Sequence, residues 1–192
     1  MKRDLILAGV GGQGLLALAA VIGEAARSLG LHVKQAEVHG MAQRGGVVQS
    51  HLRYSDTPVH SPLVSTSRVD LVLALEPMEA LRYLSYLAPE GVVIANSTPF
   101  VNIPDYPDEA TVRQELEAIE KGYLVDAAGL AKEAGALQAA NMVMLGAGSS
   151  ILALGDEALT TAIRTFFAGK PDAIIETNLT AYRLGAEVIA RA

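Results

Sequence analysis

A run of glycines between an apolar segment and a helical pattern constrains this chain more than any other feature. Residues 9–14 read GVGGQG, which satisfies G-x-G-x-x-G, and they follow the short apolar run 5–8. Beyond them, residues 15–29 carry an apolar stripe at helical spacing, which Gly30 ends. Residues 31–38 then predict a second strand. A strand, glycine loop, helix and strand within about 30 residues are typical of the opening of a doubly wound α/β fold.

Two further runs predict strands of a parallel sheet. Residues 71–75 and 92–95 are apolar at every position, which is typical of strands that helices cover on both faces. Residues 47–54 differ, because apolar side chains alternate there with polar ones such as His51 and Arg53. That alternation predicts a half-exposed strand with one polar face.

The C-terminal third is predicted to be helical. Its three helical patterns cover residues 141–154, 156–167 and 172–191, with glycines between them. The first pattern is apolar nearly all round and rich in small residues, so we expect a buried and closely packed helix. No repeat or linker divides the chain. We therefore predict one α/β domain over residues 1–192, Rossmann-like and three-layered, whose mostly parallel sheet gains a half-exposed antiparallel strand or hairpin.

The composition excludes several classes of function. Fifteen Lys and Arg stand against 21 Asp and Glu, so at a formal charge of −6 no overall positive field attracts nucleic acid or an anionic membrane. The chain has no Cys, which rules out a disulfide, a Cys nucleophile, a thiolate metal site and an iron–sulfur cluster held by this chain. Its four histidines lack metal-site spacing, so we expect no bound metal.

An apolar surplus indicates a buried interface. Apolar residues make up 51% of the chain, and the mean hydropathy of +0.30 is high for a soluble monomer. The longest apolar stretch, residues 142–154, is interrupted by glycines and serines and is shorter than the roughly 20 residues that a membrane helix needs. We find no leader pattern, so we expect a cytoplasmic protein.

The glycine loop has the residue types of a phosphate site. Gly9 permits a tight turn, Gly11 lets the backbone approach a phosphate, and Gly14 allows close packing of helix on strand. The helix that starts here favours an anion at its N-terminus. Glu37 closes the second strand 23 positions after Gly14, near the spacing of the acid that holds a dinucleotide ribose. Alone, these residues predict a free-standing NAD(P)-dependent oxidoreductase, with a purely structural turn as the other interpretation.

A second glycine-hinged loop follows Glu37. Residues 38–46, of sequence VHGMAQRGG, carry an imidazole, an amide and a guanidinium. Both loops should lie near the carboxyl ends of adjacent strands, where ligands of open α/β sheets collect, although a solvated surface loop is the alternative. Glu76, Asn96 and Asp126 end their predicted strands at the same edge, and such residues also often cap the helix that follows.

Four motifs together resemble one protein family. They are residues 9–14 (GVGGQG), 37–46 (EVHGMAQRGG), 61–63 (SPL) and 75–81 (LEPMEAL). This combination resembles the gamma-type subunit of the 2-oxoacid:ferredoxin oxidoreductases, and among them the small, or beta, subunit of the indolepyruvate branch. The resemblance covers nearly the whole chain, and its HGMAQRGG block is far more specific than the glycine fingerprint.

The resemblance implies a part in the CoA-dependent oxidative decarboxylation of a 2-oxoacid, with an acyl-CoA released and electrons passed to ferredoxin. It implies that thiamine diphosphate, Mg²⁺ and the iron–sulfur clusters sit on larger partner subunits, which agrees with the absence of Cys here. This chain would hold no cofactor and no catalytic residue, and would be inactive alone. It would complete the assembly near the active-site entrance and help to position CoA. A homodimer is a possible state of the isolated chain.

The same resemblance gives the loop residues candidate roles in binding a ligand or an interface. The backbone amides of Gly11, Gly12 and Gln13 would receive a phosphate or a partner's carboxylate. Arg44 would pair with such an anion in a fork, which Lys could not copy. A pure scaffold, whose glycine loop holds no ligand, is the remaining alternative. The candidate residues are Gly9, Gly11, Gly12, Gln13, Gly14, Glu37, His39, Gln43, Arg44 and Glu76, with His39 and Gln43 as orienting hydrogen-bonding groups.

Overall fold

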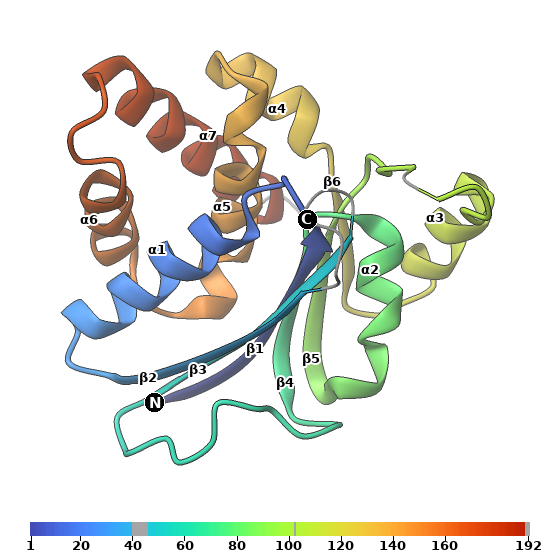
Figure 1. Cartoon of the computed structure of the whole chain (residues 1–192), viewed down its shortest axis with the longest axis horizontal. Helices are drawn as coiled ribbons and strands as arrows, with labels where there is room; N and C mark the ends of the chain where they lie inside the picture. The colour runs from blue at the N-terminus through green and yellow to red at the C-terminus, as the bar shows by residue number, and fades with distance from the viewer. Residues whose placement is uncertain (40–45, 102, 191–192) are drawn as a thin grey trace.

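A six-stranded mixed sheet forms the centre of the structure, a computed structural model that describes residues 1–39, 46–101 and 103–190 (Figure 1). The strand order is β2-β3-β1-β4-β5-β6. The neighbours from β1 to β6 pair in parallel, whereas β3 pairs antiparallel with both β1 and β2. The strands are β1 (Lys2–Val10), β2 (His32–His39), β3 (Val47–Ser55), β4 (Val69–Ala74), β5 (Leu87–Asn96) and β6 (Gly122–Val125).

Helices cover both faces of this sheet (Figure 1). Side chains of β1 alternate between two apolar layers: Leu5 and Leu7 pack in the larger one, and Ile6 and Ala8 in the smaller one on the other face. The predicted three-layer α/β fold with a mostly parallel sheet is therefore confirmed. The larger layer holds α1 (Leu15–Ser28), α4 (Ala127–Ala134), α5 (Ala140–Leu152), α6 (Asp156–Phe166) and α7 (Asp172–Ala190); the smaller holds α2 (Pro77–Arg82) and α3 (Glu109–Glu117); two short 3₁₀ turns are η1 (Leu84–Tyr86) and η2 (Leu137–Ala139).

The antiparallel part of the sheet is a hairpin of β2 and β3. Its strand β3 lies between β1 and β2, with Val47 opposite Val10 and Val48 opposite both Gly9 and His39. The expectation that the two glycine-hinged loops follow adjacent strands is therefore wrong, because the chain folds back after β2 and places β3 beside β1. Polar residues are exposed along β2, including Glu37, which suits a strand at the edge of the sheet.

The polar face of β3 is covered, so this strand is less exposed than its alternation predicts. Arg53 donates from Nε and Nη2 to the two carboxylate oxygens of Asp4, at 2.7 and 3.1 Å. Its Nη1 donates to the carbonyls of Ser61 and Leu63, at 3.0 Å each. Burial alone would raise the pKa of Asp4, but hydrogen bonds from Arg53 and Lys2 hold that pKa below its usual range. The polar face therefore anchors the loop that joins β3 to β4.

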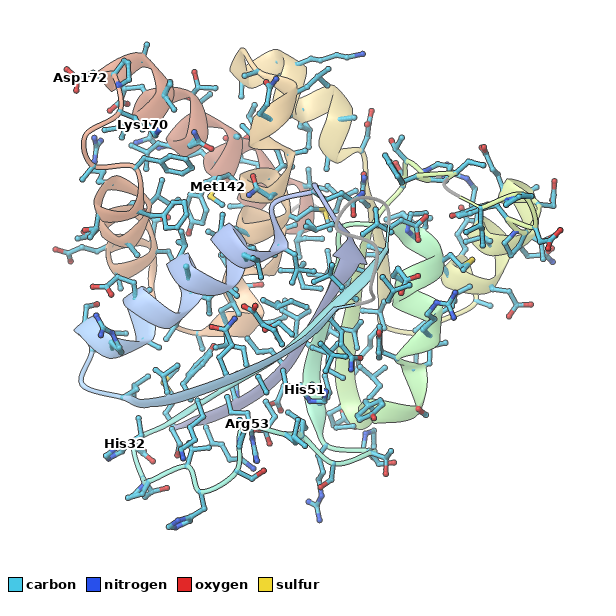
Figure 2. The ribbon with its side chains drawn as sticks, in the orientation of Figure 1. His32, His51, Arg53, Met142, Lys170 and Asp172 are labelled. Atoms are coloured by element: carbon cyan, nitrogen blue, oxygen red, sulfur yellow. The ribbon has the colours of Figure 1, made fainter. Side chains whose placement is uncertain are left out.

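His51 is the second anchor of this loop. Its buried ring accepts a hydrogen bond at Nδ1 from the Val64 amide, at 3.1 Å, and meets Tyr86 edge to face with the ring centroids 5.8 Å apart. Figure 2 shows His51 and Arg53 on the side of the sheet that faces this loop, away from α1. Burial, together with the charge of Arg53, lowers the pKa of His51, so the neutral ring is the form that the fold stabilises.

We expect acidification to destabilise the protein through His51. A His whose folded pKa is depressed contributes its full stability above its unfolded pKa of about 6.5, and this contribution is lost as the pH falls through the folded value. In His51→Asn, Oδ1 can replace Nδ1 as the acceptor but does not titrate. Urea unfolding near neutral pH and again below about pH 6 should therefore show a larger loss of stability in the wild type than in the variant. Equal losses would contradict this role of His51.

The predicted buried helix in the C-terminal third is α5. Its residues 141–148 are all buried, which confirms the expected close packing. It meets α7 through two glycines: an added Cβ would lie 1.9 Å from the Tyr182 carbonyl oxygen at Gly146, and 1.9 Å from the Val143 carbonyl oxygen at Gly185. Across the described ranges, no helix combines the length and the apolar character needed to cross a membrane.

Candidate functional site

The glycine loop connects β1 to α1 and is braced by its own glutamine. Gln13 accepts a hydrogen bond at Oε1 from the Val10 amide, at 2.9 Å, and donates from Nε2 to the Leu75 carbonyl, at 3.1 Å. A Cβ at Gly9 would lie 2.8 Å from Gln13 Oε1, so only glycine leaves room for this side chain. Gln13 therefore ties the end of β1 to the segment after β4, a role that the motif did not predict.

A second brace joins the loop to α5. Gly14 is the N-cap of α1 at φ +80°, and its carbonyl accepts a hydrogen bond from Asn141 Nδ2 at 3.1 Å. A Cβ here would lie 2.6 Å from that nitrogen, so Gly14 is required both for its backbone conformation and for space. Sequence reasoning missed Asn141, because it lies 127 residues from Gly14 and no local pattern connects the two.

Two of the three loop amides assigned to an anion are already bonded within the chain. The Gly11 amide donates to the Gly46 carbonyl at 2.8 Å, and the Gln13 amide donates to the Val10 carbonyl at 3.2 Å. The expected cradle of three free amides is therefore corrected by the structure. In the part of the chain that is described, no side chain caps the N-terminus of α1, and no acidic residue lies in its first turn. The partial positive charge of this helix end is thus retained.

A cleft of about 250 Å³ opens at this edge of the sheet, between the glycine loop and the start of α5. Its polar lining includes Gly12, Gln138 and Asn141, and Leu137 and Met144 form part of its apolar wall. The cleft lies at the carboxyl ends of β1, β4 and β5, where ligands of α/β proteins commonly bind. The arrangement suits a ligand or a partner segment with an anionic group and an apolar part.

Asn96 and Asp126 hold this edge together. Asn96 donates from Nδ2 to the Leu75 carbonyl at 3.2 Å, and its Oδ1 accepts from the Ala127 amide at 3.3 Å. Asp126 caps α4, because its side chain accepts from the Gly129 amide at 2.8 Å. Both residues therefore stabilise the strand ends and the start of α4, which is the structural alternative that their positions left open.

Glu76 is the N-cap of α2 and is 1% exposed. Its Oε2 accepts a hydrogen bond from the Glu79 amide at 2.9 Å, and its Oε1 accepts from the Phe100 amide and from the Tyr106 hydroxyl. Burial, followed by the hydrogen bond to Glu76, raises the pKa of Tyr106 well above its usual range. The Glu76 carboxylate thus caps a helix and fixes the segment after β5, as the capping interpretation predicts.

The structure does not place Glu37 where a dinucleotide site needs its acid. Glu37 lies on β2, and β3 lies between β2 and β1. The two strands β2 and β1 are therefore about 10 Å apart, which is twice the spacing of neighbouring strands. Its exposed carboxylate accepts a hydrogen bond from Gln35 Nε2 at 2.5 Å. The ribose-binding geometry therefore does not form. His39 ends β2, whereas Gln43 and Arg44 lie outside the described residues.

Two further observations limit the site. Among the residues that the structure describes, no three His, Asp or Glu side chains are grouped to hold a metal ion. A larger groove of about 700 Å³ lies between α3 and the proline-rich segment after β5, and its lining includes Pro77, Tyr106 and Leu116. Of the predicted site residues that the structure describes, none lines this groove. The glycine-loop cleft is therefore the better candidate site, because Gly12, Gln13 and Gly14 of the first motif line it.

Comparison with known proteins gives one consistent result. The sequence model of the family "Pyruvate ferredoxin/flavodoxin oxidoreductase" matches residues 4–188. Indolepyruvate oxidoreductase subunit IorB of Archaeoglobus fulgidus is 36% identical over 194 residues, covering 96% of this chain and 94% of the relative. Ketoisovalerate oxidoreductase subunit VorA of Methanothermobacter thermautotrophicus is 31% identical over 94% of this chain, yet this match is only 35% of that longer protein.

A solved structure has the same fold over the same length. The gamma subunit of keto/oxoacid ferredoxin oxidoreductase from Geobacter sulfurreducens superposes with a TM-score of 0.71 at 25% sequence identity. The superposition covers 99% of this chain and 99% of that subunit. The overall fold is thus shared over nearly the whole length of both chains.

Proposed function

Because the chain belongs to the pyruvate ferredoxin/flavodoxin oxidoreductase family, we propose that it is the small, noncatalytic subunit of a 2-oxoacid:ferredoxin oxidoreductase. The observation that carries this proposal is the match to the indolepyruvate subunit IorB, which extends over 96% of this chain and 94% of that protein. Indolepyruvate or a related aryl pyruvate is accordingly the proposed substrate class of the complex. The match spans residues 4–188, which supports one gamma-type domain.

The proposed reaction belongs to the assembly. The bond between the carboxylate and the carbonyl carbon of the 2-oxoacid breaks and CO₂ leaves; the acyl group forms a thioester with CoA, the thiol proton is released, and the two electrons of the broken bond pass to ferredoxin. Thiamine supplies the carbanion chemistry and iron–sulfur clusters carry the electrons. We assign these cofactors to larger subunits, as the family resemblance implies, and the lack of Cys in this chain agrees with that assignment for the clusters. The proposed complex is cytoplasmic.

The part proposed for this chain is to complete the active-site entrance and to position CoA. The glycine-loop cleft supports this, because the uncapped start of α1 favours a phosphate while Leu137 and Met144 offer apolar contact. The same cleft could receive a partner's carboxylate. The alternative of a free-standing NAD(P)-dependent enzyme lacks support, since Glu37 is displaced from β1 by β3.

Arg44 gives a specific prediction for CoA. If its guanidinium forms a fork with a phosphate, Arg44→Ala should raise the apparent KM for CoA by about tenfold or more, and Arg44→Lys should restore only part of the loss. Arg27→Ala is the matched control, because Arg27 lies at the far end of α1, where it pairs with Glu24 on the same helix. Unchanged assembly together with an unchanged KM for CoA in Arg44→Ala would contradict this role and favour a scaffold.

The proposed function is tested by purifying the chain from its native source without oxygen and at low salt, followed by mass spectrometry of what co-elutes in stoichiometric amount. We expect a larger, Cys-rich, thiamine-binding subunit, and a complex that reduces ferredoxin with an aryl 2-oxoacid and CoA. Elution of the chain alone with a bound nicotinamide cofactor would overturn the proposal.

A further inference from the structure

Four carboxamide side chains line the glycine-loop cleft, and two of them are already bonded within the chain. The four belong to Gln13, Asn96, Gln138 and Asn141. Gln13 and Asn96 each use both ends of the amide to hold the strand ends together. The described residues that line the cleft include none with a charged side chain. The side-chain groups left for a ligand are therefore the neutral amides of Gln138 and Asn141.

Asn141 is a buried polar residue with one unused hydrogen-bonding atom. The residue is only 7% exposed, and its Nδ2 donates to the Gly14 carbonyl at 3.1 Å. Its Oδ1 has no hydrogen-bond partner among the residues that the structure describes. This oxygen is not sealed in the core, because within the same residues Glu79 Oε2 is the only fully enclosed side-chain atom without a partner. Asn141 therefore presents a free acceptor to the cleft that it lines.

The bond to Gly14 also fixes the orientation of the Asn141 amide. Rotation of the amide would turn Oδ1 towards the Gly14 carbonyl, and two acceptors would then face each other. The cleft therefore keeps an acceptor at this point and rejects a ligand that offers a second acceptor there, because both groups would stay unpaired.

Gln138 supplies a donor close to this acceptor. It lies on η2, three residues before Asn141, and lines the same cleft. Its side chain is exposed and forms no hydrogen bond within the described part of the chain. A free acceptor and a free donor together suit a ligand edge that carries a donor beside an acceptor. Adenine has such an edge at its 6-amino group and N7, and Asn and Gln are the side chains that read this edge in nucleic acids.

The cleft is large enough for one part of CoA alone. Its volume of about 250 Å³ is below the roughly 300–1,000 Å³ of a pocket that encloses a whole drug-sized ligand. The pantetheine arm is needed elsewhere, because its thiol must reach the acyl group on the thiamine-bearing subunit. The phosphates carry charges that two neutral amides do not balance. The adenine ring is the remaining part, and it is neutral, flat and apolar on its faces.

We propose that the cleft binds the adenine ring of CoA, an inference that rests on the proposed function. Asn141 Oδ1 accepts from the 6-amino group, and the Gln138 amide donates to N7. Leu137 and Met144 contact the faces of the ring, for which the thioether of Met is well suited. The two amides thus determine specificity for the base and take no part in the chemistry. Hypoxanthine, which has a carbonyl oxygen in place of the 6-amino group, would meet Asn141 Oδ1 with a second acceptor.

The test compares CoA with its deaminated analogue, in which hypoxanthine replaces adenine, on the intact complex isolated from the native host. We measure kcat/KM for both forms during reduction of ferredoxin with an aryl 2-oxoacid, and take their ratio within each complex. The wild-type complex should favour CoA by about tenfold or more, and Asn141→Ala should lower this ratio to about threefold or less. A purely structural role of Asn141 would instead reduce both values alike and leave the ratio unchanged.

Asn178→Ala is the matched control. Asn178 is also 7% exposed and also donates from Nδ2 to a backbone carbonyl, but it does not line the cleft. Its variant should keep the wild-type ratio. Gln138→Ala should raise the KM for both forms of CoA by about threefold or more, because N7 is present in both bases, and should leave the KM for the 2-oxoacid unchanged.

A wild-type ratio within about twofold of unity, or an Asn141→Ala complex that keeps the wild-type ratio, would overturn the adenine site. The proposed function would survive either result, since the complex would still reduce ferredoxin with CoA. Its own failure is different, because no form of CoA would then support turnover. If Asn141→Ala does not assemble, Gln138→Ala decides: an unchanged KM for CoA in that variant would show that the base is not bound here.

Discussion

Replacing Gly185 or Gly146 by alanine is expected to destabilise the protein by about 3 kcal/mol or more, which is at or above the upper end for overpacking. An added Cβ at either position would lie 1.9 Å from a carbonyl oxygen of the facing helix. Both obstacles are backbone atoms in the interior of helices, so no side-chain rotation can relieve the overlap. α5 and α7 would have to move apart, and the apolar contacts on both sides of the crossing would be lost.

Gly23→Ala is the matched control for this prediction. Gly23 is also helical, but its added Cβ would meet only Val33 Cγ1, at an ordinary contact distance of 3.9 Å. Since alanine is the better helix former, this variant should be stabilised by about 0.5–1 kcal/mol. Denaturant unfolding of the three variants measures the difference. A loss below about 1 kcal/mol for both Gly185→Ala and Gly146→Ala would show that α5 and α7 are not this close.

Arg53→Ala is expected to cost about 3 kcal/mol or more of stability, because it leaves the Asp4 carboxylate buried without its main partner. The Asp4 side chain is 3% exposed and that of Arg53 is 17% exposed, so water replaces little of the lost interaction. The variant also frees the carbonyls of Ser61 and Leu63, which Arg53 holds at 3.0 Å. Arg53→Lys should recover only part of the loss, since an ammonium cannot form the fork.

Lys2→Ala separates this effect from simple charge removal. Lys2 contacts the same carboxylate at 2.9 Å, but its side chain is 58% exposed, so its loss should cost less than about 1 kcal/mol. A double-mutant cycle with Asp4→Asn and Arg53→Ala gives the pairwise interaction energy directly. A coupling near zero, or equal losses for Arg53→Ala and Lys2→Ala, would contradict the assignment of Arg53 as the anchor.

The fold was predictable where the local pattern and the tertiary environment agree. Continuous apolar runs identified β1, β4 and β5, and the all-round apolar segment identified the buried α5. The strand order was not predictable, because the unit at residues 4–38 is typical of adjacent parallel strands and nothing local shows that β3 is inserted between them. The polar residues Arg53 and His51 led to the expectation of a half-exposed β3 for a similar reason. Their hydrogen-bond partners, Asp4 and Val64, lie outside this strand, so the local pattern could not show them.

The candidate site was predictable in position more than in detail. The carboxyl edge of the sheet and the glycine loop follow from the fingerprint, and the cleft lies there. The sequence could not show that Gln13 braces the loop through Leu75 or that Asn141 holds Gly14, because both contacts depend on tertiary packing. Glu76 was ambiguous between ligand and cap, since a carboxylate before proline suits both.

The central claim is that catalysis belongs to an assembly which this chain completes without carrying out the chemistry. It is tested most directly by separating the chain from its larger subunit and measuring CoA-dependent reduction of ferredoxin with indolepyruvate by each part and by the two remixed. The account predicts that neither part turns over alone and that remixing restores the activity. Full turnover by the larger subunit alone, or hydride transfer to NAD(P)⁺ by this chain alone, would contradict it.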